Sequence, residues 1–500
     1  MDLFIFLLVL FSIIWTVSLI LTSNSKARKS SKLPPGPYQF PIIGNILQLG
    51  PKPHQSIAQL SKTYGPLMSL KLGSITTIVV SSPETAKSVL QTHDLSFSSR
   101  TIPSAALALN HGEFSMVWLP VGNKWRQLRK ICREQMFSVS RLDSGQDLRK
   151  EKLEKLRDYV RECCETGRVV DIGEAAFTTS LNLVSTTLFS TEFAQLGSDS
   201  SQEMKDLFWG VMKCLAKPNL ADFFPILKSV DPQGILKQNT IYFERLFNIF
   251  DGIIDEKLKF RRSTKNENEV HDLLDALLDL NQRDESELSR IDIKHLLVDL
   301  FVAAADTTSN TVEWAMTELL RNPKQMSRVK TEIEDIVGQN GQIQESDISK
   351  LPFLQAVVKE TFRLHPVVPL LVPHKAEADT EINGYIVPKN AQVLVNVWAS
   401  GRDTNVWSNA DVFMPERFLS HSEIDFRGKD FELIPFGAGR RICPGLPLAY
   451  RMVHLMVATF VHKFGWKLED GKKLEEIDVT EKFGLTLQKA IPMKAFPIEM

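Results

Sequence analysis

The most informative segment of this 500-residue chain is Phe436-Gly437-Ala438-Gly439-Arg440-Arg441-Ile442-Cys443-Pro444-Gly445. It places one cysteine among three glycines, which allow tight turns and a close approach of the backbone to a flat cofactor. Free N–H groups in such a loop can point at a thiolate and tune its electron density. A guanidinium such as that of Arg441 grips carboxylates in a bidentate way. These features fit a Cys443 thiolate that binds haem iron, with Arg441 against a propionate. Without the full spacing, a glycine-rich loop around a buried structural cysteine would be the better interpretation.

The composition is that of a large globular protein: 43% of the residues are hydrophobic, 24% are charged, and the formal net charge is −1. This balance gives no indication of nucleic-acid binding, and no repeat or low-complexity linker divides the chain. The five cysteines form no disulfide framework and no C-x-x-C pair. We expect the four cysteines other than Cys443 to be free thiols in a reducing compartment.

The amino terminus predicts a membrane anchor. Leu3 to Leu21 is nearly all apolar, and 19 helical residues span roughly 28 Å, close to the thickness of an endoplasmic reticulum bilayer. Basic residues follow this run and none precedes it, which favours an uncleaved anchor over a signal peptide and places the body in the cytosol. We therefore predict a transmembrane anchor over 1–23, a basic and proline-rich linker over 24–45, and a catalytic domain over 46–500.

Local patterns predict a body that is mainly α with a small β-sheet region. Leu67–Leu72 and Ile75–Val80 form a predicted hairpin, and Ser82 with the following proline predicts a helix start. Residues 120–365 carry mainly helical periodicity, which includes a long helix over Leu296–Leu319. Gln392–Val397 has the pattern of a strand.

Two polar pairs lie at helical spacing. Glu360 and Arg363 share one face of a predicted helix, which by itself indicates only a surface ion pair. Trp125 and Arg129 are four residues apart, and both can donate to a haem propionate. An ordinary amphipathic helix explains that spacing equally well, and nearby basic residues indicate either a solvated face or a docking face for an acidic reductase.

Asp306 and Thr307 lie within the predicted helix Leu296–Leu319, after three alanines. Small residues let a flat cofactor lie against a helix, and the Thr307 hydroxyl can bond the carbonyl one turn back and open a groove. An acid beside such a hydroxyl can relay protons in a dry site. In most helices, however, an Asp-Thr-Thr run has no such role.

The decapeptide, the Glu360/Arg363 pair and the segment Phe413–Phe418 together resemble the motifs of the cytochrome P450 family, along nearly the whole chain after Leu33. The resemblance implies the haem-thiolate fold and haem b with Cys443 as the axial ligand. It further implies that Arg417 joins Glu360 and Arg363 in a structural triad that locks the cysteine loop. The residues implied to bind the cofactor are Cys443, Arg441, Trp125, Arg129, His374, Phe436 and Gly437. Asp306 and Thr307 are the implied catalytic residues.

Two positions depart from the family pattern. Ala304 stands where glycine is usual, and its methyl group narrows the groove for dioxygen. His374 stands where many related plant enzymes have an arginine against a propionate, and histidine can still donate there. A lone histidine in a strand is also often simply packed or solvated.

Further stretches, such as Ser98–Thr101, Glu313–Met316 and Asp430–Phe436, are similar to the plant subfamily that includes geraniol 8-hydroxylase and the abietane diterpene hydroxylases. This resemblance implies a microsomal monooxygenase of the endoplasmic reticulum membrane that hydroxylates a lipophilic terpenoid, with a monoterpene alcohol such as geraniol as the first candidate. O2 and electrons from NADPH, passed on by NADPH-cytochrome P450 reductase, are the implied co-reactants. The segments implied to line the substrate pocket are the loop after Arg100, the face around Ala303, Val367–Val372 and Gly484–Thr486. The middle two are almost wholly apolar, which suits a lipophilic substrate.

Three alternatives remain at this point. A haem-thiolate isomerase or dehydratase would need no reductase, although such enzymes tend to lack the acid–threonine pair. A monooxygenase could instead act on an alkaloid or a phenylpropanoid. A haem-binding sensor or carrier would leave the apolar pocket and the Asp306-Thr307 pair unexplained.

Overall fold

The structure is a computed structural model that describes residues 5, 8, 9, 11, 12, 14–16, 32–196, 202–263, 272–283, 288–468, 473 and 476–499. Its helices are α2 (Ile46–Leu49), α3 (Pro53–Tyr64), α4 (Pro83–Lys87), α5 (Asn123–Gln135), α6 (Val139–Ser144), α7 (Gln146–Glu165), α8 (Ile172–Phe189), α9 (Gln202–Ala216), α10 (Leu220–Phe223), α11 (Ile235–Ser263), α12 (Leu273–Arg283), α13 (Arg290–Arg321), α14 (Pro323–Val337), α15 (Pro352–Leu364), α16 (Val397–Ser400), α17 (Arg417–Ser420) and α18 (Leu446–His462). Its strands are β1 (Leu67–Leu72), β2 (Ile75–Val80), β3 (Ser99–Arg100), β4 (Val170–Asp171), β5 (His374–Lys375), β6 (Thr380–Ile382), β7 (Tyr385–Val387), β8 (Gln392–Val395), β9 (Phe464–Lys467), β10 (Glu481–Lys482), β11 (Gln488–Lys489) and β12 (Lys494–Glu499).

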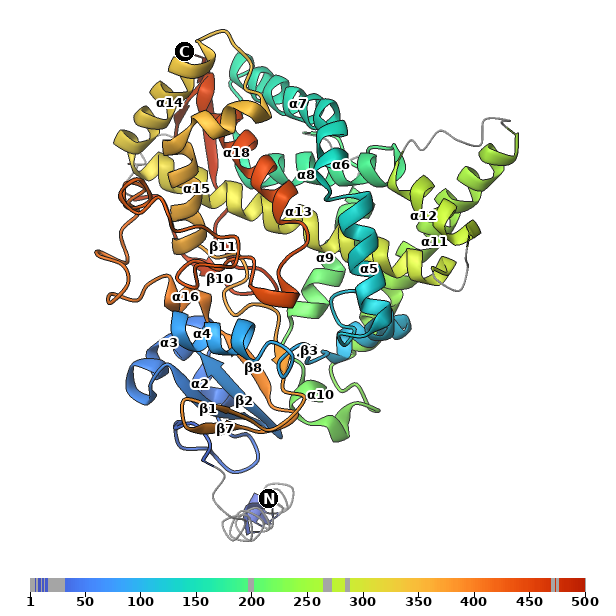
Figure 1. Cartoon of the computed structure of the whole chain (residues 1–500), viewed down its shortest axis with the longest axis vertical. Helices are drawn as coiled ribbons and strands as arrows, with labels where there is room; N and C mark the ends of the chain where they lie inside the picture. Colours follow the sequence, from blue (N-terminus) through green and yellow to red (C-terminus); the bar gives the residue numbers. More distant parts are fainter. Residues whose placement is uncertain are drawn as a thin grey trace.

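Helix α13 runs through the middle of the helical body and contacts α8, α15 and α18 (Figure 1). It begins with a capping box, in which the Ser289 hydroxyl accepts the Asp292 N–H and the Asp292 carboxylate accepts the Ser289 N–H. Most of its side chains are buried, polar and charged ones included, so the helix is enclosed around most of its circumference rather than along one apolar stripe. The central helix therefore carries Asp306 and Thr307 into the interior.

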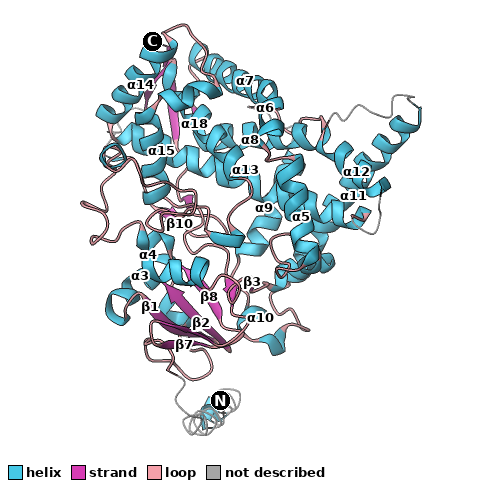
Figure 2. Ribbon diagram, viewed as in Figure 1, coloured by secondary structure: helices cyan, strands magenta, loops and turns pink. Residues whose placement is uncertain are grey.

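The largest sheet has the strand order β1-β2-β8-β5-β3 and lies at the end of the molecule opposite α14 (Figure 2). Strands β2 and β8 are parallel, whereas the other pairs are antiparallel. The register pairs Arg100 of β3 with His374 of β5, so an arginine and a histidine far apart in the sequence meet at one edge of the sheet. Three further small sheets consist of β4-β12-β9, β10-β11 and β6-β7.

Most of the local predictions are confirmed. The hairpin is β1 and β2 with the predicted bounds, and the turn residue Gly73 has a φ of +59°. Ser82 caps α4. The long helix extends beyond Leu296–Leu319 at both ends. The strand predicted over Gln392–Val397 ends at Val395, because the side chain of Asn396 accepts the Ala399 N–H and starts α16 there. All five cysteines are free thiols.

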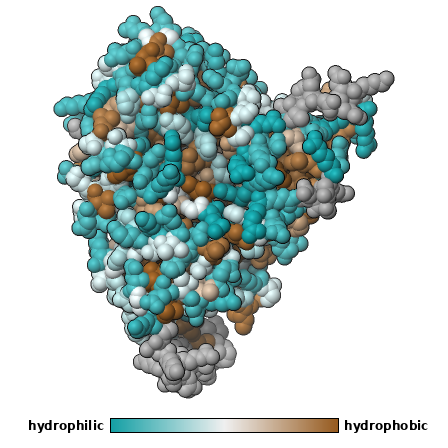
Figure 3. Space-filling model, viewed as in Figure 1, coloured by the Kyte–Doolittle hydropathy of each residue, from teal (hydrophilic) through white to brown (hydrophobic). Residues whose placement is uncertain are grey.

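The predicted anchor over 1–23 lies largely outside the described residues. Within the described part of the chain, no helix is long and apolar enough to span a bilayer. The face drawn in Figure 3 is largely hydrophilic, with smaller apolar areas between.

Exposed apolar side chains gather around the β1–β2 turn. The Gly73 N–H donates to the Ile43 carbonyl at 3.2 Å, and the Ser74 N–H donates to the Phe223 carbonyl at 2.9 Å. These bonds bring the segment after the proline-rich stretch next to α10. The exposed apolar residues of the two segments are Tyr38, Phe40, Ile42, Leu47, Leu220, Ile226 and Val230.

Candidate active site

The cysteine loop is closed by a backbone hydrogen bond of 3.0 Å from the Cys443 N–H to the Phe436 carbonyl. Gly437 and Gly439 have φ values of +71° and +64°, a region that side chains disfavour. A Cβ at Gly439 would lie 2.1 Å from the Leu90 carbonyl oxygen, so the loop packs directly on that backbone. Gly437 and Gly439 are therefore required by the shape of the loop, whereas Gly445 has an ordinary φ of −79° and room for a side chain.

The Cys443 sulfur lies at the start of α18. Burial raises the pKa of the Cys443 thiol, whereas the Gly445 and Leu446 N–H groups and the charge of Arg129 lower it. Donors at a helix N-terminus stabilise a thiolate in this way. The Cys443 side chain lies among protein atoms and is nevertheless solvent-accessible, so it faces space inside the fold rather than a packed neighbour.

Helix α13 has an accessible face in its middle. Ala303 is exposed and Val302, Ala304 and Thr307 are half-buried, although most of the helix is buried. The Thr307 hydroxyl donates to the Ala303 carbonyl at 2.8 Å, as the sequence predicts. Ala304 packs against the hydrophobic core that contains Phe301. Its extra methyl group therefore contacts core side chains.

The Asp306 carboxylate points to the C-terminal segment rather than to Thr307. It accepts the Thr486 hydroxyl and, at 3.1 Å, the Gln488 amide. Burial raises the pKa of Asp306, which these donors oppose. Asp306 and Thr307 are thus neighbours on α13, as predicted. The Asp306 carboxylate is nevertheless bound by Thr486, which belongs to a segment that the resemblance implies to line the substrate pocket.

The predicted pocket segments are in direct contact with one another. The Leu487 N–H donates to the Val367 carbonyl at 2.7 Å, which joins the C-terminal loop to the apolar segment Val367–Val372. That segment is half-buried for most of its length, and its Leu371 has the unusual φ of +50°. Strained backbone of this kind often lies at functional sites. Apolar side chains around an acid and a hydroxyl suit a lipophilic ligand.

Three arginines meet beside the cysteine loop. Arg129 and Arg441 both lie over the Trp125 ring, with guanidinium carbons 5.5 and 4.9 Å from its centroid. Arg129 donates to the Ile442 carbonyl, and Arg441 donates to carbonyls that include that of Ser98 at 2.7 Å. Burial lowers the pKa of Arg441 to about 10, and burial together with the other two arginines lowers that of Arg100 to about 9.

No carboxylate among the described residues pairs with this arginine cluster, and the buried Nε of Arg100 has no hydrogen-bond partner there. Buried cations ordinarily have a counter-charge. The cluster therefore fits a group with two carboxylates, which is what the propionates of haem provide. Arg100 was not predicted to bind the cofactor, because the sequence analysis names it only as the residue before a loop of the substrate pocket. The pairing of β3 with β5 is what brings it here.

His374 lies in this cluster, fully enclosed. Its Nδ1 donates to the Phe97 carbonyl at 2.7 Å, since a carbonyl oxygen can only accept. Burial and the positive charges of Arg100 and Arg441 keep the pKa of His374 well below its usual value. A neutral imidazole with its proton on Nδ1 has none on Nε2. His374 can therefore donate to a propionate only if the anionic group offsets these charges.

The predicted triad is assembled in the interior. Arg363 donates to the Glu360 carboxylate at 2.7 and 2.8 Å, and the Arg417 Nε lies 3.0 Å from Glu360 Oε2. Glu360 also accepts the Met414 N–H at 2.7 Å. Side chains of Glu360 and Arg363 are completely buried, so the pair is not the surface ion pair that its spacing alone indicates. Phe436 of the cysteine loop packs edge-to-face on Phe362 of the same helix, with ring centroids 5.2 Å apart.

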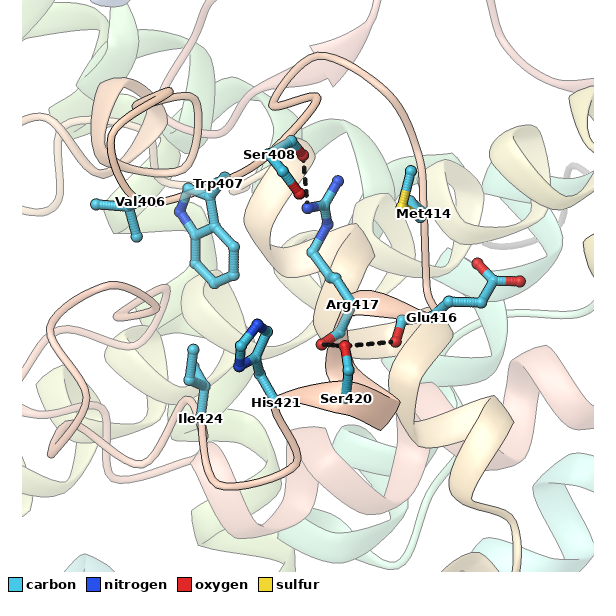
Figure 4. Close-up of a pocket in the computed structure, with 9 residues that line it drawn as sticks. All are labelled: Val406, Trp407, Ser408, Met414, Glu416, Arg417, Ser420, His421 and Ile424. Atoms are coloured by element: carbon cyan, nitrogen blue, oxygen red, sulfur yellow. Dashed lines mark hydrogen bonds between the residues drawn. The ribbon is translucent and has the colours of Figure 1, made fainter.

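A surface pocket of about 240 Å³ lies on the outer side of this triad (Figure 4). Its polar groups already have partners, since Arg417 donates to the Ser408 carbonyl at 2.8 Å and the Ser420 hydroxyl donates to the carbonyls of Arg417 and Glu416. We assign this pocket a structural rather than a catalytic role.

An accessible thiol with N–H donors, a cluster of arginines without a carboxylate partner and a helix with an acid next to a hydroxyl fit the haem-thiolate site that the sequence predicts. The family model for cytochrome P450 matches residues 34–493, and the chain belongs to the cytochrome P450 family. Members of this family bind haem through a cysteine thiolate and receive electrons from redox partners.

The relatives are plant proteins. The chain is 58% identical to Cytochrome P450 76T24 of Catharanthus roseus over 486 residues, 97% of each chain. It is 50% identical to geraniol 8-hydroxylase of the same plant, covering 98% of this chain and 99% of the relative, and 49% identical to ferruginol synthase of Isodon rubescens, covering 96% and 97%. A zebrafish cytochrome P450 solved with progesterone is 26% identical and superposes with a TM-score of 0.75, over 90% of this chain and 99% of that one. The predicted family and plant subfamily are confirmed.

Proposed function

We propose that this protein is a membrane-anchored monooxygenase that hydroxylates a lipophilic terpenoid, with a monoterpene alcohol such as geraniol as the first candidate. The observation that carries the proposal is the accessible Cys443 thiol at the start of α18, in a chain with relatives named geraniol 8-hydroxylase and ferruginol synthase. The relative at 58% identity has a name that states no substrate, so the terpenoid is inferred from the other two.

In this proposal Cys443 would bind the iron of haem b, and Phe436 and Gly437 would shape the loop that presents the thiolate. Arg100, Arg129, Arg441, Trp125 and His374 would hold the propionates. The bound haem supplies the activation of dioxygen. Thr307 holds a proton-bearing hydroxyl on the accessible face of α13, and Asp306 is the acid that resupplies it. The triad of Glu360, Arg363 and Arg417 has a structural role, which is to fix α15 against the segment that leads to the cysteine loop.

Electrons would come from NADPH through NADPH-cytochrome P450 reductase. The basic face of α5, which includes the exposed Arg126, Lys130 and Arg133, is the proposed docking face. Residues 1–23 would anchor the protein in the endoplasmic reticulum membrane, with residues 24–45 as the linker and 46–500 in the cytosol. The exposed apolar side chains around the β1–β2 turn support contact between that end of the body and the bilayer.

The experiment that tests this proposal is turnover in microsomes that contain the reductase, with geraniol, sesquiterpenes and abietane diterpenes as separate substrates. Hydroxylated product that depends on NADPH supports it. Product formed without NADPH and reductase would favour an isomerase or dehydratase. Turnover of alkaloids or phenylpropanoids alone would contradict the terpenoid assignment.

Replacing Arg100 by methionine is expected to weaken haem retention by a factor of roughly ten to a hundred, since a charged hydrogen bond contributes about 1.5–3 kcal/mol. The haem-free protein should change little in stability, because relief of the repulsion among three like charges offsets the loss of the hydrogen bond from Arg100 to the Val372 carbonyl. Haem transfer to apomyoglobin and thermal unfolding measure the two effects. Arg133→Met, at an exposed position of α5, is the control. Haem retention equal to that of the wild type would remove Arg100 from the cofactor site.

Replacing Thr307 by alanine is expected to uncouple NADPH oxidation from product formation, with most electrons ending in peroxide or water. The loss removes the hydroxyl on the accessible face of α13, while Ala303 and the backbone stay in place. Product, peroxide and NADPH are measured in the same reaction. Thr311→Ala is the control, because its buried hydroxyl makes the same bond one turn on, to the Thr307 carbonyl. Full coupling in Thr307→Ala would exclude Thr307 from proton delivery.

A further inference from the structure

Helix α13 carries a second buried acid that the site described above does not use. Glu313 lies seven residues after Asp306, so the two carboxylates lie close to one face of the helix, two turns apart. The Glu313 side chain is buried, and its Oε1 accepts the Met493 N–H at 2.7 Å. No cation among the described residues forms an ion pair with it. Ordinary packing does not require a carboxylate at such a position, because burying one is costly.

The backbone around Glu313 makes room for its carboxyl group. Gly173, in the first turn of α8, faces it so closely that a Cβ there would lie 2.8 Å from the carboxyl carbon. The residue two positions earlier is Asp171, which caps α8 by accepting the Glu174 N–H at 3.0 Å. The Asp171 side chain is 28% exposed and lies 3.8 Å from the Lys494 ammonium. Asp171 is therefore a partly exposed acid close enough to the buried carboxyl to influence its pKa.

The groups around Glu313 leave it able to exchange a proton near neutral pH. The pKa of Glu313 is raised to about 7, mainly by burial; the charges of Asp171 and Asp306 contribute to the rise, whereas the Met493 N–H and the Lys489 ammonium oppose it. Burial also raises the pKa of Asp306 and of Asp171. The three acids therefore interact electrostatically, and Glu313 is the middle one.

Polar groups fill the interval between Glu313 and Asp306. Seven helical residues span about 10.5 Å, which is too far for a direct transfer. Asn310 lies between them and donates to the Asp306 carbonyl at 2.8 Å. Gln488 of β11 donates to the Asp306 carboxylate at 3.1 Å, and the charge of its neighbour Lys489 lowers the pKa of Glu313. Strand β11 thus runs beside α13 and lines the interval with groups that can order water.

We propose that Asp171, Glu313 and Asp306 form a proton inlet that leads from the surface at β4, along α13, to the Thr307 hydroxyl. This inference rests on the proposed monooxygenase function. Hydroxylation of a substrate RH consumes one O2, two electrons from NADPH and two protons, and yields ROH and water. Each proton passes from Asp306 through Thr307, Asp306 is reprotonated from Glu313, and solvent reprotonates Glu313 through Asp171. Glu313 touches neither substrate nor cofactor and acts through Asp306.

The central test is Glu313→Gln, which keeps an oxygen for the Met493 N–H but cannot exchange the proton. We expect kcat to fall about tenfold at neutral pH, with KM and haem content unchanged and a larger solvent deuterium isotope effect. The wild-type kcat should decline as the pH rises through about 7, because Glu313 must be protonated to donate. This decline should be absent in Glu313→Gln. Asp171→Asn should change kcat and the isotope effect in the same direction while it still caps α8.

Glu332→Gln is the matched control. Glu332 is a half-buried carboxylate that, like Glu313, accepts backbone N–H groups, those of Phe353 and Leu354 at 2.7 and 2.9 Å, but it lies on α14 away from the inlet. It should leave kcat and the isotope effect unchanged. An unaltered kcat and isotope effect in both Glu313→Gln and Asp171→Asn would overturn the proposal.

A second readout does not depend on turnover. Infrared difference titration of the resting protein should show a protonated carboxyl band that disappears as the pH rises through about 7, and Glu313→Gln should lack this band. If the wild type lacked this band, the proposed proton inlet would be wrong. If no terpenoid is oxidised by any variant, the proposed function fails, whereas the titration still decides whether Glu313 exchanges a proton.

Discussion

Cys443→Ser is expected to abolish the absorption band that ferrous haem-thiolate proteins show with carbon monoxide, and to abolish turnover with it. A serine hydroxyl is a far weaker iron ligand than a thiolate. The Gly445 and Leu446 N–H groups at the start of α18 favour the charge on sulfur. The loop itself should survive the substitution, because its closure depends on glycines and on the backbone bond from Cys443 to Phe436.

The control for this experiment is Cys164→Ser, a half-exposed free thiol on α7. It should retain the carbon monoxide band and full activity. If both variants kept the band, a residue other than Cys443 would be the iron ligand.

Glu360→Ala is expected to destabilise the protein by about 3–5 kcal/mol, which is enough to lower the yield of folded, haem-loaded protein severely. The change removes the only carboxylate that Arg363 and Arg417 contact among the described residues. It also leaves the Met414 N–H without its acceptor. Two buried guanidinium groups would then lack a counter-charge. Arg363 keeps its bonds to the carbonyls of Ala410 and Val412, but these do not neutralise it.

Glu416→Ala is the comparison. Glu416 lies next to Arg417 in sequence, yet its pair with Arg328 is at the surface, with 40% and 48% of the two side chains exposed. Exposed pairs contribute about 0–1 kcal/mol, so its removal should change the melting temperature little. Chemical denaturation of the two variants measures the difference. Equal effects would show that the Glu360 triad does not stabilise the fold.

The sequence predicted those parts of the site that depend on short-range spacing. Cys443 with its glycines, the Thr307 hydroxyl and the β1–β2 hairpin each depend on residues a few positions apart, and the structure has each as expected. The burial of Glu360 and Arg363 could not be read from their spacing, because the same three-residue interval also suits a solvated face.

The parts that sequence reasoning missed depend on long-range pairing. Arg100 joins the arginine cluster only because β3 pairs with β5, more than 270 positions away in sequence. Asp306 turns toward Thr486 because the C-terminal hairpin packs on α13. The role proposed for Glu313 could be inferred only from its contacts with Gly173 and Met493. A local pattern contains no information on such contacts between distant segments.

The central claim is that this chain inserts oxygen from O2 into a terpenoid at a haem held by Cys443. Turnover of geraniol under isotopically labelled dioxygen, in membranes with reductase and NADPH, tests it most directly. The account predicts one labelled oxygen atom in each hydroxylated product and no product when NADPH is omitted. Product whose new oxygen comes from water, or product formed without NADPH, would contradict it.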